Sequence, residues 1–124
     1  MTICLDSYGW LEILANGPKA EAYGRAIARV PPDQIITSVV SLYEVYKKAK
    51  RTRGEPAALE GVAAMGHTHV VAVDRELALD AADLSLMHEL HFADALIYAT
   101  ARRFHADLWT SDTALKGLPS VHFV

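Results

Sequence analysis

The sequence predicts a single α/β domain, with a mostly parallel central sheet of about five strands flanked by helices. Short apolar runs alternate with longer segments of helical pattern, which is typical of βα units around a parallel sheet. The chain has 124 residues, of which 52% are hydrophobic and 22% charged, as in an ordinary globular protein. It contains no internal repeat, low-complexity tract or linker, so residues 1–124 are expected to fold as one unit.

The first elements are a strand and two helices. The apolar run from Thr2 to Leu5 is the first strand candidate. A helix from Ser7 to Ala15 follows and ends at the stop signal Asn16-Gly17-Pro18. A second helix runs from Lys19 to about Arg29 and stops at Pro31-Pro32.

The next segment predicts a second strand and another helix pair. The strand extends from Gln34 to Thr37, and Ser38 is a suitable N-cap for an amphipathic helix that Gly54 would close. Glu55 to Met65 forms the next helix, with Pro56 at an early position where its missing N–H costs little.

The last third of the chain predicts three strands and a helical hairpin. The strands are Val70 to Val73, Asp107 to Thr110 and Val121 to Val124. Residues 75 to 89 and 92 to 104 form the two helices between the first and second of these strands.

Four carboxylates lie in apolar or small-residue settings where a solubilising charge is not needed: Asp6, Glu44, Asp94 and Asp112. Asp and Glu are seldom buried unless they are paired or bind a metal ion. Like charges crowded by folding either raise the pKa of some members or are neutralised by a cation. Because only oxygen ligands are offered, Mg²⁺ or Mn²⁺ is the expected ion.

The predicted strands bring these acids to one edge of the sheet. Asp6 ends the first strand and Asp112 follows the fourth, although each could also be a helix cap. Asp94 lies in the first turn of an apolar helix with no Arg or Lys one turn away, which favours a functional role. The position of Glu44 is the least determined. Asp74 also ends a strand and could join the cluster, but an ordinary N-cap is the stronger expectation.

An acidic cluster that binds Mg²⁺ or Mn²⁺ is suited to phosphodiester hydrolysis. The hydroxyls of Ser7, Thr110 and Ser111 lie beside Asp6 and Asp112, where they could orient the carboxylates or cap helices. No Walker-type loop, GxSxG elbow, CxxC pair or HExxH helix is present, which excludes nucleoside-triphosphate, serine-hydrolase and zinc-protease sites.

The remaining features of the sequence limit the expected cell compartment and partners. The N-terminus has no signal-peptide pattern and no apolar run reaches membrane length, so a cytoplasmic protein with no membrane contact is expected. Cys4, the only cysteine, is expected to be a buried hydrophobe.

The net charge of −3 argues against a protein that coats nucleic acid. Basic residues nevertheless gather after Glu44, either as a solvated helix end or as a surface for phosphate or an acidic partner.

Four segments together resemble the PIN-domain ribonucleases, and within them the VapC toxins of prokaryotic toxin–antitoxin pairs. They are LDSYGW at the N-terminus, TSVVSLYEVYKKAK, FADALIYATARR and LWTSD near the end. The resemblance covers nearly the whole chain and implies an endoribonuclease whose acidic Mg²⁺/Mn²⁺ pocket comprises Asp6, Glu44, Asp94 and Asp112. It implies Asp6 and Asp94 as the direct metal ligands.

The family resemblance also implies a homodimer and a small antitoxin that blocks the site. The hypothetical RNA or antitoxin surface is the helix from Lys47 to Arg53, in particular Lys47, Lys50 and Arg51, together with Tyr43, Tyr46, Arg102 and Arg103. Two other interpretations stay open. One is a catalytically inactive PIN-like binding module, and the other is a receiver-like signalling domain, although the latter expects an acidic pair after the first strand and a Lys after the last.

Overall fold

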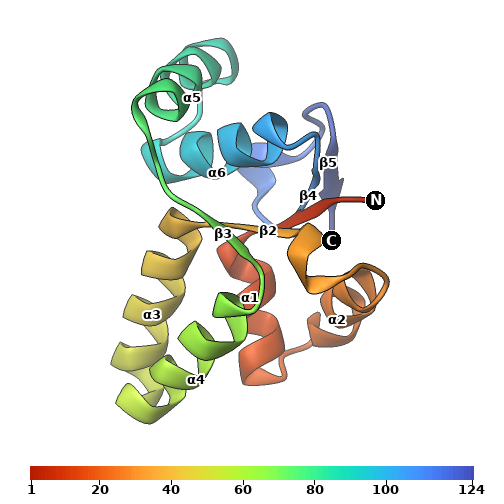
Figure 1. Ribbon diagram of the computed structural model, residues 1–124, viewed down its shortest axis with the longest axis vertical. Helices are drawn as coiled ribbons and strands as arrows, with labels where there is room; N and C mark the ends of the chain where they lie inside the picture. Colours follow the sequence, from red (N-terminus) through yellow and green to blue (C-terminus); the bar gives the residue numbers. More distant parts are fainter.

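Five parallel strands form the central sheet of the computed structural model, which describes residues 1–124 (Figure 1). The strands are β1 (Ile3–Leu5), β2 (Ile35–Ser38), β3 (His69–Val71), β4 (Asp107–Thr110) and β5 (Val121–Phe123). Their order in the sheet is β3-β2-β1-β4-β5, and every neighbouring pair is parallel. The predicted α/β fold class with a parallel five-stranded sheet is therefore confirmed.

Helices cover both faces of the sheet. They are α1 (Ser7–Ala15), α2 (Ala20–Ala28), α3 (Val39–Arg53), α4 (Glu55–Gly66), α5 (Arg75–His88) and α6 (Phe92–Arg103), with short 3-10 turns η1 (Pro32–Gln34) and η2 (Thr113–Leu115). Figure 1 shows α5 and α6 on one side of the sheet and α1 to α4 on the other. None of the helices has both the length and the apolar character that a membrane span requires.

Local signals in the sequence set the helix boundaries. The side chains of Ser38 and Asp74 accept hydrogen bonds from backbone N–H groups in the first turns of α3 and α5, at 3.1 and 2.8 Å. Asn16 ends α1 in the left-handed conformation, with φ of 51°, and Gly54 separates α3 from α4 with φ of 94°. These caps satisfy backbone groups that a helix end leaves unpaired.

The strands contribute to two hydrophobic cores because their side chains alternate between the faces of the sheet. In β1, Cys4 packs into the core that α5 and α6 cover, together with Ile97 and Leu108. Ile3 and Leu5 point to the opposite core, beneath α1 to α4. Cys4 is fully buried, as expected.

The strand order places a natural crevice beside β1. From β1 the chain adds β2 and β3 on one side, crosses back through α5 and α6, and adds β4 and β5 on the other side. In open parallel sheets, ligands bind at the carboxyl ends of the strands where the order reverses, here between β1 and β4. Receiver-like domains have the order 2-1-3-4-5, so this fold excludes the receiver interpretation.

Gly9 allows α1 to lie close to its neighbours. A Cβ at Gly9 would come within 2.7 Å of the ring of Tyr23 and 2.8 Å of Leu5 Cγ. We expect Gly9→Ala to lower the free energy of unfolding by about 1–3 kcal/mol, because both neighbours are fully buried and have no room to yield.

Gly24 in α2 provides the matched control. Nothing lies within 4 Å of a Cβ built there, so Gly24→Ala should raise the free energy of unfolding by roughly 0.5–1 kcal/mol. Urea unfolding of both variants measures the difference. Equal effects at the two positions would contradict the close approach at Gly9.

Candidate acidic site

Asp6 is the buried centre of the candidate site. It follows β1 and is 2% exposed. Thr110 Oγ1 donates to its Oδ2 at 2.6 Å, and the Ser7 backbone N–H and hydroxyl donate to its Oδ1 at 2.6 and 3.3 Å. Burial raises the pKa of Asp6 to about 6, because desolvation of the carboxylate outweighs these hydrogen bonds and the charges of Glu44 and Asp112 act in the same direction.

Thr110 connects Asp6 to the loop after β4. While its hydroxyl donates to Asp6, its Oγ1 accepts from the Asp112 backbone N–H at 2.9 Å. Asp112 in turn accepts from Ala114 N at 2.9 Å and so caps η2. One hydroxyl therefore fixes both the carboxylate of β1 and the backbone that presents Asp112.

Asp94 reaches the same place from α6. It lies in the first turn of that helix and is half-buried. Burial, the charge of Asp112 and a hydrogen bond to Asp112 raise the pKa of Asp94 to about 7, and the charges of Asp6 and Glu44 raise it further. Glu44, half-buried in α3, acts on both Asp6 and Asp94. The structure thus brings all four predicted carboxylates together.

No basic side chain forms an ion pair with any of the four acids. The ion pairs of the structure join Arg25 to Glu21 and Arg103 to Asp74, all of them outside the four acids. As the side chains stand, no three His, Cys, Asp or Glu residues form a ready-made metal ligand set. Mg²⁺, however, commonly uses one or two carboxylates and several waters. The oxygen-only donors and the uncompensated charge fit such an ion.

The raised pKa values predict how the metal-free protein responds to pH. Unfolded Asp side chains titrate near 3.8, so the folded state binds more protons than the unfolded state between about pH 4 and pH 7. The contribution of Asp6 and Asp94 to the free energy of unfolding therefore falls as the pH rises through this window.

We expect Asp94→Asn to weaken that decrease. Without divalent ions, its Tm should exceed that of the wild type at pH 8, where Asp94 is charged, and should approach it at pH 5, where Asp94 is protonated. Thermal unfolding in EDTA at both pH values measures this. If the Tm of the two proteins changed by the same amount between pH 5 and pH 8, the charged form of Asp94 would not be destabilised by its neighbours.

Some predicted residues lie elsewhere. Ser111, expected to orient a carboxylate, instead accepts from the Tyr23 hydroxyl at 2.5 Å and donates to the Val124 carbonyl at 3.1 Å, so that prediction was wrong. Asp74 is the N-cap that was expected, and it also binds Arg103. Arg102 lies in the last turn of α6, over the Tyr98 ring and away from the acids.

Of the predicted basic residues of α3, the structure places Lys47 and Arg51 in a groove that also contains Glu44 and Ser7. Lys50 does not line it. Two groove residues were not singled out in the sequence, although Lys48 lies within the predicted surface helix from Lys47 to Arg53. Lys48 lies one turn after Glu44 and Tyr8 two residues after Asp6, but only the packing of α1 beside α3 shows that they share a groove.

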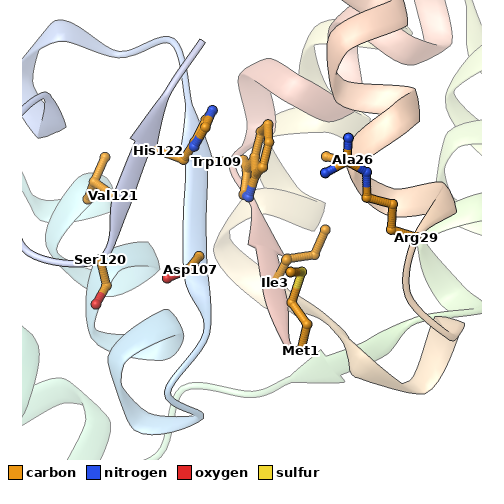
Figure 2. Close-up of a pocket in the computed structure, with 9 residues that line it drawn as sticks. All are labelled: Met1, Ile3, Ala26, Arg29, Asp107, Trp109, Ser120, Val121 and His122. Carbon is orange, nitrogen blue, oxygen red and sulfur yellow. The ribbon is translucent and has the colours of Figure 1, made fainter.

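Two other concave surfaces contain none of the four acids. One, of about 320 Å³, lies over β1, β4 and β5, where Trp109 and His122 stack with ring centroids 3.7 Å apart (Figure 2). The other, of about 550 Å³, lies between α5 and α6 and is almost entirely apolar, with Leu86 and Phe92 exposed on it. The four acids therefore lie apart from both of these surfaces, at the edge between β1 and β4.

The fold and the site define a parallel α/β domain with a cluster of acidic side chains at its topological switch point. The PIN domain family model matches residues 3–120. This chain belongs to the PIN-domain family, as the resemblance in sequence indicated.

Solved structures share the fold over nearly the full length. A toxin–antitoxin complex from Klebsiella pneumoniae has 22% identity and a TM-score of 0.79, with 99% of this chain and 100% of that chain covered. VapC20 from Mycobacterium tuberculosis, described as a sarcin–ricin loop cleaving toxin, has 22% identity and a TM-score of 0.77, with 97% and 98% covered. VapBC2 from Rickettsia felis, bound to a promoter DNA fragment, has 14% identity and a TM-score of 0.79, with 100% and 98% covered.

At these identities, the likeness establishes the fold. No curated protein matches the chain significantly in sequence.

Proposed function

We propose that this chain is a Mg²⁺- or Mn²⁺-dependent endoribonuclease and acts as the VapC-type toxin of a toxin–antitoxin pair. The observation that carries the proposal is the gathering of Asp6, Glu44, Asp94 and Asp112 at one sheet edge without a neutralising cation. Membership of the PIN family and the likeness to solved toxin–antitoxin proteins support it. Residues 1–124 would form a PIN-like nuclease domain.

In this proposal, Asp6 and Asp94 hold the metal ion, and Glu44 and Asp112 complete the negative pocket. Such an ion, when bound, orients and acidifies a water and stabilises charge on the phosphate. Thr110 and Ser7 hold the Asp6 carboxylate in place through their hydrogen bonds, which limits its rotation. Burial of Asp6 excludes bulk water from one side of the pocket.

The related structures support an antitoxin as the protein partner. Several of them are complexes of a toxin with its antitoxin, and we infer a small cognate antitoxin for this chain. We also infer a homodimer and action in the cytoplasm, where the RNA substrate is found. Sedimentation of the purified protein, alone and after co-expression with the reading frame adjacent to its gene, tests both assemblies.

Cleavage of RNA by the purified, antitoxin-free protein tests the proposed activity. Total RNA and intact ribosomes are incubated with Mg²⁺, with Mn²⁺ or with EDTA, and the new 5′ ends are mapped by sequencing. Ribosomes are included because a related structure is that of a sarcin–ricin loop cleaving toxin. We expect discrete cuts with either metal and none in EDTA.

The same experiment distinguishes the rival interpretation, a catalytically inactive PIN-like binding module. The lack of a ready-made three-residue ligand set is the observation that favours it. A folded protein that binds neither Mg²⁺ nor Mn²⁺ by calorimetry and cuts no RNA would establish the binding module and refute the nuclease.

A further inference from the structure

A groove between α1 and α3 leads away from the acidic site. It has a volume of about 330 Å³ and includes Glu44, one of the four acids, and Ser7, which binds Asp6. Its other walls include Tyr8 of α1 and the α3 residues Tyr43, Lys47, Lys48 and Arg51. Figure 1 shows α1 and α3 in the same layer, below the sheet. We call these five residues the basic groove.

The cations of the basic groove form a row along α3. Lys47, Lys48 and Arg51 follow Glu44 by three, four and seven residues, which places them on one face of the helix. At 1.5 Å per residue, the row from Glu44 to Arg51 extends over about 10 Å. All three cations are exposed, and neither of the ion pairs in the structure involves them.

This distribution of charge has a consequence for an anionic ligand. The chain has a net charge of −3, and the carboxylate cluster alone would repel phosphate. A row of cations without ion-pair partners that starts at the cluster lowers that repulsion along α3. An RNA strand would therefore extend from the site along α3.

The groove also offers aromatic rings. Tyr8 is 49% and Tyr43 62% exposed. Lys47 Nζ donates to the Tyr43 hydroxyl at 3.4 Å and lies 5.4 Å from its ring centroid, which helps to fix the ring. Exposed aromatic rings beside cations bind single strands, because unpaired bases stack on the rings while the cations contact phosphates.

We propose that the basic groove binds the single-stranded RNA segment that flanks the scissile bond, with Lys47, Lys48 and Arg51 on phosphates and Tyr43 or Tyr8 stacked on an unpaired base. This inference rests on the proposed nuclease function and deepens it by naming the strand form and its path. A duplex would not expose base faces to these rings.

The neighbouring pair Tyr46 and Lys50 is a matched control within the same helix. Lys50 Nζ donates to the Tyr46 hydroxyl at 3.4 Å and lies 5.4 Å from that ring, as in the groove pair. Neither residue lines the groove. The two pairs therefore share chemistry and helical spacing but differ in position.

The test measures RNA binding by the full chain in EDTA, so that no strand is cut. The probe is a fluorescein-labelled 12-nucleotide RNA without secondary structure, and Kd is taken from fluorescence anisotropy over a series of KCl concentrations. For the double variant Lys47→Ala/Lys48→Ala, we expect Kd to rise about 10-fold or more and the slope of log Kd against log[KCl] to fall by about 1.4, the value for two lost phosphate contacts.

The tyrosine variants separate stacking from charge. Tyr43→Ala should raise Kd about fivefold or more with an unchanged salt slope, while Tyr43→Phe, which keeps the ring, should bind within about twofold of the wild type. Lys50→Ala and Tyr46→Ala should also stay within about twofold, because both residues lie outside the groove.

Unchanged RNA affinity in the groove variants, or an equal loss in the Lys50 and Tyr46 controls, would overturn the proposal and leave an acidic segment of a protein partner as the occupant of the groove. RNA binding is measured without metal and does not depend on cleavage, so each of the two proposals can be refuted independently of the other. RNA bound through the groove but never cut would refute the nuclease alone. Metal-dependent cutting by groove variants that bind RNA as the wild type does would refute the groove alone.

Discussion

Asp94→Asn is expected to reduce metal-dependent RNA cleavage at least about 100-fold. The substitution keeps the size of the side chain but removes one of the two negative charges proposed to hold the cation. It also relieves the crowding that raises the pKa of Asp94 to about 7, so the variant should fold at least as stably as the wild type. A loss of cleavage would then result from the changed site and not from unfolding. Initial rates on the RNA cut by the wild type measure the effect.

Asp74→Asn is the matched control for this substitution. Asp74 also lies between a strand and a helix, but it caps α5 through Leu77 N and binds Arg103 at 2.9 Å, outside the acidic cluster. We expect a slightly lower Tm and unchanged cleavage. If Asp74→Asn and Asp94→Asn lost cleavage equally, the assignment of the site to the four acids would be wrong.

Metal binding provides a readout that does not depend on activity. An ion that binds only the folded state raises its stability in proportion to the logarithm of the ion concentration. Millimolar Mg²⁺ at pH 8 should therefore raise the Tm of the wild type but have little effect on that of Asp94→Asn or Asp6→Asn. An equal rise in all three proteins would place the ion elsewhere.

The sequence predicted the fold well because its local signals agree with one another. Asn16-Gly17 and Gly54 end helices, and Ser38 and Asp74 begin them, where their backbone preferences require. The predicted bounds of the third strand were the least accurate. It was predicted to extend to Val73 but ends at Val71, because its length is set by pairing with Ile36, Thr37 and Ser38 of β2.

The candidate site was predictable where it depended on strand ends. Asp6 and Asp112 follow the adjacent parallel strands β1 and β4, so topology alone brings them together. Glu44 was less determined, because the direction in which a helical side chain points depends on how α3 packs against its neighbours. The same cause explains why Lys50 was singled out and Lys48 was named only as part of the helix from Lys47 to Arg53: the position of α1 determines which cations line the groove.

Ser111 shows that residues adjacent in the sequence need not belong to the same site. Successive side chains of an extended segment point to opposite sides, so Thr110 and its neighbour Ser111 could not both reach Asp6. Thr110 donates to Asp6, whereas Ser111 contacts Tyr23 of α2 and the carbonyl of Val124. Hydroxyl content alone did not reveal which of the two would orient the carboxylate.

Thr110→Val should therefore impair the site more than any other hydroxyl deletion. The variant removes the 2.6 Å hydrogen bond to Asp6 and the acceptor of the Asp112 backbone N–H. Because Thr110 is fully buried, water cannot replace these bonds, and we expect a loss of about 1–3 kcal/mol in the free energy of unfolding. The Mg²⁺ concentration for half-maximal cleavage should rise about 10–100-fold, because the proposed ligand Asp6 is no longer held in place.

Thr110→Ser separates this role from simple packing. Serine keeps the hydroxyl and loses only a methyl group, so the variant should lose some stability through the small cavity but retain a metal requirement close to that of the wild type. A titration of cleavage against Mg²⁺ for both variants, each at a temperature where it is folded, makes the comparison. If the serine variant needed as much Mg²⁺ as the valine variant, Thr110 would act through its packing, and the connection that it makes between Asp6 and the loop of Asp112 would have no part in metal binding.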